Sequence, residues 1–218
     1  MVELTEELRK ATFEYLGVSD SSKLRHIERV VNFFSGFPEI IVLETSKMAN
    51  PIYVMSYLAT NREPQKKREL KNRFIIGFLF WTGVRVNEMI ETKRKDLDLI
   101  TRTYNVPTLK QRKRVYRPIP LNHVPVAELK LWNNYLTTFA NLGDRLVGIT
   151  DRQVERIVKK VLGPKFTPHT LRHGLALWLY EYTKDIRVVS QILRHTNIAN
   201  TLIYTRLSLE GVREKIAL

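Results

Sequence analysis

The sequence contains no cysteine, and this absence removes several kinds of chemistry at once. Without thiols, the chain cannot form disulfides, use a thiolate nucleophile, or bind zinc or iron-sulfur clusters through cysteine. Any catalytic chemistry must therefore come from other side chains.

Long apolar runs and nucleotide-binding glycine motifs are missing as well. No stretch reaches the roughly 18 consecutive apolar residues that a membrane helix needs. The chain has neither a P-loop nor a Rossmann glycine pattern, and it shows no internal repeat. Residues 1–7 are acidic, whereas a secretory or organellar leader would begin with basic residues. We therefore expect a cytoplasmic protein that stays where it is made.

Positive charge is what the sequence has in excess. Its 218 residues include 36 Lys and Arg against 22 Asp and Glu, a formal net charge of +14. Residues 1–60 hold 6 basic and 8 acidic side chains, so the excess lies in the remainder, in dense runs at 66–73, 93–95 and 110–117. Basic side chains placed against phosphates release condensed counterions, so this clustering favours nucleic acid as the partner. A solvated basic surface without a special purpose is the alternative.

Hydrophobic periodicity predicts a mainly α fold with one small antiparallel β-hairpin or sheet. The predicted helices lie near 4–15, 22–34, 51–58, 64–81, 84–92, 125–140, 151–162, 168–182, 185–194, 197–206 and 208–217. The β signal is confined to residues 102–121, where Pro118 and Pro120 should keep the second strand at a sheet edge. The apolar stretch from Phe74 to Trp81 must be buried core.

Histidine and arginine are the side chains best placed for chemistry. His169 and Arg172 fall one turn apart near a predicted helix start, which suits a phosphate. Taken alone, this pair is more often ordinary surface. A zinc site built on His169 and His173 is not favoured, because no carboxylate is in register and no third ligand is near. Further along, His195 precedes Tyr204 by nine residues, and upstream Arg85 follows an apolar helix and a glycine, with Glu88 one turn later.

Together these segments resemble the catalytic domain of the tyrosine recombinase, or phage integrase, family. The matching boxes are Thr-Gly-x-Arg-x-x-Glu at 82–88, His-x-Leu-Arg-His at 169–173, and Leu-x-His followed by Tyr at 193–204. The resemblance implies a tyrosine-recombinase catalytic domain with a C-terminal tail helix over residues 61–218. Residues 1–60 would then be a short helical region, either a reduced DNA-clamping domain or an interaction module.

The resemblance also implies a role for each site residue. Arg85 and Arg172 would hold the scissile phosphate, Tyr204 would attack it, His169 would accept the tyrosine proton, and His195 would hydrogen-bond the phosphate. Two bidentate guanidiniums suit a phosphate that gathers negative charge. The departing 5′ oxygen would take its proton from a lysine on the hairpin turn, for which we choose Lys110, with Lys113 as the competitor.

Glu88 is interpreted as a residue that orients Arg85 or a histidine, and an ordinary surface glutamate is an equal alternative. Two features depart from the family pattern: the hairpin has no glycines, and Arg194 stands where a glycine usually precedes the third-box histidine. The basic side chains expected to contact DNA are Lys66, Lys67, Lys93, Arg94, Arg112, Lys113, Arg114 and Arg194.

The expected function is site-specific recombination of double-stranded DNA through a covalent 3′-phosphotyrosine, with no metal or nucleotide cofactor. By the same resemblance, we expect a monomer in solution that forms a homo-tetramer on DNA. Its expected role is to integrate or excise a mobile element such as a virus or plasmid. Accessory DNA-bending proteins are further candidate partners. The amphipathic tail at 207–218 would dock on a neighbouring subunit.

Three other functions stay open. A type IB topoisomerase would share the nucleophile, although such enzymes typically have lysine at the position of His169. A DNA-binding protein with a silent pocket would keep the basic surface, its His, Arg and Tyr side chains being merely structural. Telomere resolution is less favoured because the chain is short.

Overall fold

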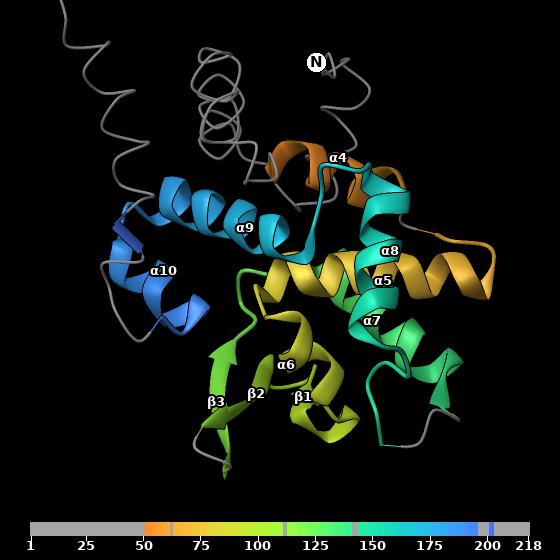
Figure 1. Ribbon diagram of the computed structural model, residues 1–218, viewed down its shortest axis with the longest axis horizontal. Helices are drawn as coiled ribbons and strands as arrows, with labels where there is room; N and C mark the ends of the chain where they lie inside the picture. The colour runs from red at the N-terminus through yellow and green to blue at the C-terminus, as the bar shows by residue number, and fades with distance from the viewer. Residues whose placement is uncertain (1–50, 62, 111–112, 141–143, 196–200, 203–218) are drawn as a thin grey trace, which may run out of the picture.

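The computed structural model describes residues 51–202, apart from positions 62, 111–112, 141–143 and 196–200. Helices make up most of the fold, and a small sheet lies at one edge of them (Figure 1). In chain order the elements are α4 (Pro51–Thr60), α5 (Lys67–Thr82), α6 (Val86–Glu91), a 3-10 turn (Arg94–Asp96), β1 (Leu97–Asp98), β2 (Thr103–Lys110), β3 (Lys113–Pro120), α7 (Val126–Thr138), α8 (Asp151–Leu162), α9 (Pro168–Thr183) and α10 (Ile186–Leu193). The predicted fold class is confirmed. The division at residue 60 stays a prediction, because the first 50 residues lie outside the described part.

Helix α5 forms the centre of the fold, and its sequence explains why. The run from Phe74 to Trp81 leaves no polar face, and the helix is buried along this whole stretch. It packs against α4, α7, α8 and α9. The helix ends where Gly83, at φ 57°, donates its amide to the Leu79 carbonyl over 3.0 Å. The predicted end of this helix is thus confirmed, while its start is Lys67 rather than Pro64.

A buried ion pair joins α5 to its neighbours. The Arg73 guanidinium donates to both carboxylate oxygens of Glu128 on α7, over 2.8 and 2.6 Å, and to the Leu58 carbonyl of α4 over 3.0 Å. Trp132 donates its indole N–H to the same carboxylate over 2.8 Å. Gly77 leaves the space for this arrangement, because a Cβ there would lie 1.9 Å from Glu128 Oε1.

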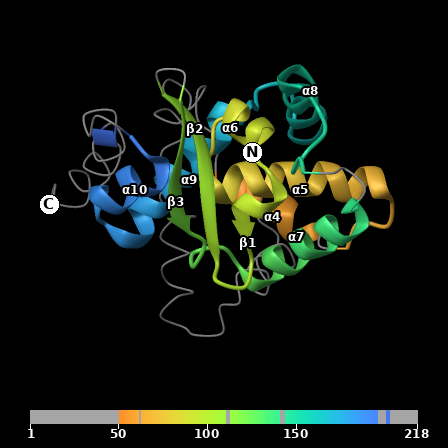
Figure 2. The ribbon, with the colours of Figure 1, turned by 90° about the horizontal axis from the view of Figure 1, so that it is seen from below.

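The sheet has the order β1-β2-β3 and is antiparallel throughout (Figure 2). Strands β2 and β3 pair from Thr103 with Pro120 to Lys110 with Lys113. Tyr104 of β2 points into the core, where its ring lies 5.2 Å from that of Phe78. The predicted hairpin and the edge position of β3 are confirmed. The short strand β1 was not predicted, because two residues are too few to show an alternating pattern.

The last described helices begin at the polar capping residues and the proline that the sequence predicts. Thr150 caps α8, and Asp185 caps α10 by accepting the Arg187 amide over 2.8 Å. Pro168 is the first residue of α9, after the cap Thr167. The predicted helix at 197–206 lies mostly, and that at 208–217 entirely, outside the described residues. Among the helices that the structure describes, none combines the length and apolar character needed to cross a membrane.

Candidate active site

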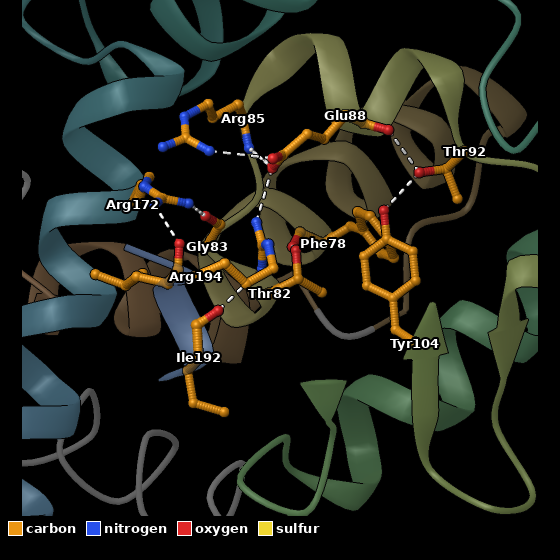
Figure 3. A network of polar contacts seen from close by, with 11 residues as sticks. Phe78, Thr82, Gly83, Arg85, Glu88, Thr92, Tyr104, Arg172, Ile192 and Arg194 are labelled. Atoms are coloured by element: carbon orange, nitrogen blue, oxygen red, sulfur yellow. Dashed lines mark hydrogen bonds and ion pairs between the residues drawn. The ribbon is translucent and has the colours of Figure 1, made fainter. Parts of the chain in front are cut away.

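Several helix ends bring the predicted phosphate-binding side chains together. Arg85 is the N-cap residue of α6, Arg172 lies in the second turn of α9, and His195 follows the end of α10. Figure 3 shows Arg85 and Arg172 on neighbouring elements around the loop at Gly83. The Arg85 side chain is about half exposed, at 51%, so its guanidinium is accessible from outside the protein.

Arg172 is almost fully buried, and backbone carbonyls hold its guanidinium. Nη1 donates to the Gly83 carbonyl and Nη2 to the Leu193 carbonyl. These two carbonyls belong to the ends of α5 and α10, where helix carbonyls lack partners within the helix. One side chain thus fixes α9 to both ends, and its position is set before any ligand binds.

Glu88 connects two arginines through a single carboxylate. Oε1 accepts from Arg85 Nη1 over 3.1 Å, while Oε2 accepts the Arg85 amide over 2.8 Å and Arg194 Nη2 over 2.7 Å. Burial acts to raise the pKa of the Glu88 carboxyl, but the charges of Arg194, Arg85 and Arg172 and the bond from the Arg85 amide together hold it below the usual value. The contact expected between Glu88 and Arg85 is therefore present, and the carboxyl is ionised at neutral pH.

A further set of hydrogen bonds fixes α6 beneath Glu88. The Thr92 hydroxyl donates to the Glu88 carbonyl over 2.7 Å, and it lies 2.5 Å from the hydroxyl of Tyr104 on β2. Burial raises the pKa of the Tyr104 phenol, so this hydroxyl stays protonated at neutral pH. The sheet thereby supports the helix that carries Arg85.

Arg194 does not have the surface position that a DNA contact requires. It caps α10 in a left-handed conformation, at φ 57°, and only 7% of the residue is exposed. Its guanidinium faces inward, toward Glu88 and the Ile192 carbonyl, because the buried carboxylate needs a cation. The predicted DNA contact of Arg194 is thus replaced by an internal ion pair.

The histidines of the site have low proton affinity. Burial lowers the pKa of His169, and the charges of Arg172 and Arg85 lower it further. For His195, burial, these two arginines, Arg194 and His169 lower the pKa to about 4. Both imidazoles are therefore neutral at pH 7 and able to accept a proton or donate a single N–H.

Two residues of this cluster receive no catalytic or binding role from the sequence. His173 lies against His169 with ring centroids 4.6 Å apart and ring planes at 90°, and burial followed by the charges of His169, Arg172 and His195 lowers its pKa to about 4. The buried hydroxyl of Thr201 lies 2.8 Å from His195 Nδ1. The second histidine of the 169–173 box was a signal for His173, whereas nothing in the local pattern marks Thr201.

Other predicted site residues fall where the structure gives less. Tyr204 and Arg112 lie outside the described residues. For Lys110, Lys113 and Arg114 the structure describes the backbone alone: Lys110 pairs with Lys113, and Arg114 with Leu109, at the end of the hairpin. The choice between Lys110 and Lys113 stays open.

The remaining basic residues divide between surface and structure. Lys66 and Lys67 are exposed, with Lys66 4.0 Å from Glu69, and Lys93 lies 3.4 Å from Asp144. Arg94 differs: its guanidinium donates to the Leu136 and Phe139 carbonyls at the end of α7. This contact caps the end of α7, where the terminal carbonyls lack helical partners, and the DNA contact of Arg94 stays a prediction.

The cluster suits a phosphate ester more than a metal. Within the described part of the chain, no group of three or more His, Cys, Asp or Glu side chains could hold a metal ion. The geometry instead gathers guanidiniums and neutral imidazoles, which bind anionic oxygens and move protons.

Comparison with known proteins agrees with this chemistry. The profile of the phage integrase family matches residues 54–210. Tyrosine recombinase XerA of Pyrococcus furiosus is 30% identical over 162 residues, which cover 69% of this chain and 55% of that protein. Tyrosine recombinase XerD of Staphylococcus saprophyticus is 25% identical over 226 residues, covering 91% of this chain and 76% of that one. The chain spans about half the length of the first curated relatives that it matches.

Solved structures share the fold. The XerH site-specific recombinase bound to a palindromic difH substrate superposes with a TM-score of 0.62 at 22% identity, over 79% of this chain and 53% of that one. The crystal structure of XerA recombinase gives a TM-score of 0.53 at 23% identity and covers 96% and 97% of the two chains. The family profile covers most of the chain and includes Arg85, Glu88, Arg172, His195 and Tyr204. The protein therefore belongs to the phage integrase, or tyrosine recombinase, family.

Proposed function

We propose that this chain cleaves and rejoins double-stranded DNA as a site-specific recombinase, through a covalent 3′-phosphotyrosine. One observation carries the proposal: Arg85, half exposed and held by Glu88, lies in one cluster with Arg172 and the neutral imidazoles of His169 and His195. Family membership and the net charge of +14 support DNA as the substrate.

In this proposal Arg85 binds the phosphate to be cleaved, and the buried Arg172 adds its positive charge behind it. A phosphodiester under attack gathers negative charge on its non-bridging oxygens, and guanidiniums placed beforehand stabilise that charge. Arg85 supplies the accessible fork, and Arg172 contributes from a position fixed by the Gly83 and Leu193 carbonyls. Preorganisation of this kind avoids rearrangement during the reaction.

Tyr204 is the proposed nucleophile. Its hydroxyl oxygen attacks phosphorus while His169 accepts the proton, the tyrosyl–phosphorus bond forms, and the bond to the 5′ oxygen breaks. Lys110, or its competitor Lys113, gives that oxygen a proton. His195 hydrogen-bonds the phosphate through Nε2, a role supported by the Thr201 hydroxyl beside Nδ1, since donation from this hydroxyl would leave the ring proton on Nε2. Rejoining reverses each step with a second DNA end.

The finer role proposed is integration or excision of a mobile element, by a homo-tetramer assembled on DNA inside the cell. The proteins that match this chain include Xer recombinases and a transposon integrase. The structure of the Tn1549 transposon integrase in complex with circular intermediate DNA has a TM-score of 0.56 at 17% identity. The tail at 207–218 is the segment proposed to join neighbouring subunits.

Replacing Tyr204 tests the proposed reaction directly. DNA flanking the encoding gene, incubated with the protein in EDTA and run on a denaturing gel, should give a covalent protein–DNA adduct. Tyr204→Phe should abolish this adduct, because it removes the attacking oxygen. Tyr182→Phe, which alters a half-exposed tyrosine of α9, is the matched control and should keep it. Binding of the same DNA without any adduct from the unaltered protein would contradict the proposal.

A further inference from the structure

Arg194 combines two unfavourable features that call for an explanation. Among the described residues, Arg102, Lys184 and Arg194 are the non-glycine residues with positive φ, and Arg194 alone of these is buried. A left-handed backbone favours glycine, and a buried charge is costly unless it is paired. Such a feature beside a reactive cluster is a reason to look for a function.

The contacts of Arg194 lead to Arg85 through one carboxylate. Arg194 Nη2 donates to Glu88 Oε2 over 2.7 Å, and the other carboxylate oxygen accepts Arg85 Nη1 over 3.1 Å. Figure 3 shows the Glu88 carboxylate between the side chains of the two arginines. Glu88 therefore holds the Arg85 guanidinium by Oε1 alone, while Oε2 accepts the Arg85 amide and the Arg194 guanidinium.

The balance of charge explains what this division achieves. Glu88 is buried and ionised, so it needs a cation close by. If Arg194 were absent, the Arg85 guanidinium, which already donates to Oε1, would compensate this carboxylate by bonding Oε2 as well. A bidentate pair between Arg85 and Glu88 would then use two of the guanidinium donors that a phosphate needs.

We propose that Arg194 is a positioning residue that acts on Arg85 through Glu88. By occupying Oε2, it limits Glu88 to one guanidinium contact and keeps the other Arg85 donors directed outward. The inference rests on the proposed function for the claim that Arg85 binds the scissile phosphate. The state of the Arg85 side chain itself can be measured without DNA.

Arg194→Gly tests the inference while suiting the left-handed backbone. Single-turnover formation of the covalent adduct should slow by about 10- to 100-fold, as is typical when a residue supporting a site is lost. The affinity for the same DNA should change by less than about threefold, because Arg85 would be misplaced rather than removed. Phenylglyoxal labelling of Arg85, followed by mass spectrometry on the free protein, should slow as Arg85 closes onto Glu88.

A second substitution separates positioning from general damage. In Arg194→Gly combined with Glu88→Gln, no ionised carboxylate draws Arg85 inward, so labelling of Arg85 and adduct formation should both recover in large part. Lys184→Gly is the matched control. It also replaces a left-handed helix-capping cation that pairs with a neighbouring glutamate, Glu181, and it should leave labelling and cleavage unchanged.

Each outcome decides one of the two claims. Unchanged labelling and cleavage in Arg194→Gly would overturn the inference and leave the proposed function intact. A slow single variant that the Glu88→Gln change fails to rescue would also overturn it. If the unaltered protein forms no adduct, the proposed function fails, and the labelling of Arg85 in the same variants still decides whether Arg194 controls that side chain.

Discussion

At the scale of single residues, the site keeps its imidazoles neutral by burying them and, to a smaller extent, by placing guanidiniums beside them. His173 and His195 have pKa values of about 4, and that of His169 is lowered in the same direction, against an ordinary value near 6.5. Neutral imidazoles can accept a proton from a reacting group near pH 7. In mild acid, however, the same histidines stay neutral in the folded chain while the unfolded chain binds protons on them.

This difference predicts a loss of stability in mild acid. As pH falls from about 6.5 toward 4, the unfolded chain binds protons on these imidazoles and the folded chain does not, so the free energy of unfolding decreases. His173→Gln removes one such group. Between pH 7.5 and 5, the free energy of unfolding of this variant should therefore fall by on the order of 1 kcal/mol less than that of the unaltered protein. Urea unfolding at a series of pH values measures this. An identical pH slope in the variant would contradict the assignment.

At the scale of elements, the site is built from helix ends. The carbonyls of Gly83 and Leu193 at the ends of α5 and α10 fix Arg172, and the start of α6 carries Arg85. Gly83 is restricted in two ways: its φ is 57°, and a Cβ there would lie 2.8 Å from Leu193 and 2.9 Å from Leu175.

Gly83→Ala should therefore damage both the fold and the site. We expect a loss of about 1–3 kcal/mol from backbone strain and overpacking. Adduct formation per folded molecule should fall as well, because the Gly83 carbonyl that holds Arg172 would shift. Gly163→Ala provides the comparison: its φ of 110° also makes alanine strained, but the nearest neighbouring atom is 3.9 Å away and belongs to Phe166. Thermal melts and adduct assays should show destabilisation in both variants and lost cleavage in Gly83→Ala alone.

How far the sequence predicts these elements depends on how local the signal is. The α5 end at Gly83, the caps Thr150 and Asp185, and the edge prolines of β3 are local signals, and the structure confirms each. The sequence does not predict the burial of Arg194, because its guanidinium meets Glu88, a partner 106 positions away in the chain. A charged residue in a sequence is normally expected at the surface. A buried hydrogen-bond acceptor for its side chain is revealed only by the tertiary structure.

At the scale of the whole molecule, one buried ion pair joins α5 to two neighbouring helices, α4 and α7. The Arg73 and Glu128 side chains are 1% and 0% exposed, and their contacts reach α4 and Trp132 of α7. Sequence periodicity places Arg73 one residue before an apolar run, which does not reveal its burial. The pair fixes how α4, α5 and α7 meet.

Breaking this pair should be far worse than replacing it. Glu128→Leu leaves the Arg73 cation buried without its carboxylate and should cost about 3–5 kcal/mol. The double variant Arg73→Met with Glu128→Leu removes both charges and should cost much less than the sum of the single changes. Urea unfolding of the four proteins completes the cycle. Additive losses would show that the two side chains stabilise the fold independently.

The prolines of β3 have a consequence for the protein in concentrated solution. Pro118 and Pro120 are exposed at the outer strand of the sheet, two positions apart, so both would have turned any amide toward the same side. Neither residue carries an amide hydrogen. A strand of another copy that paired with β3 would therefore lack two backbone hydrogen-bond donors. The sheet is thereby guarded against edge-to-edge aggregation when many copies crowd together.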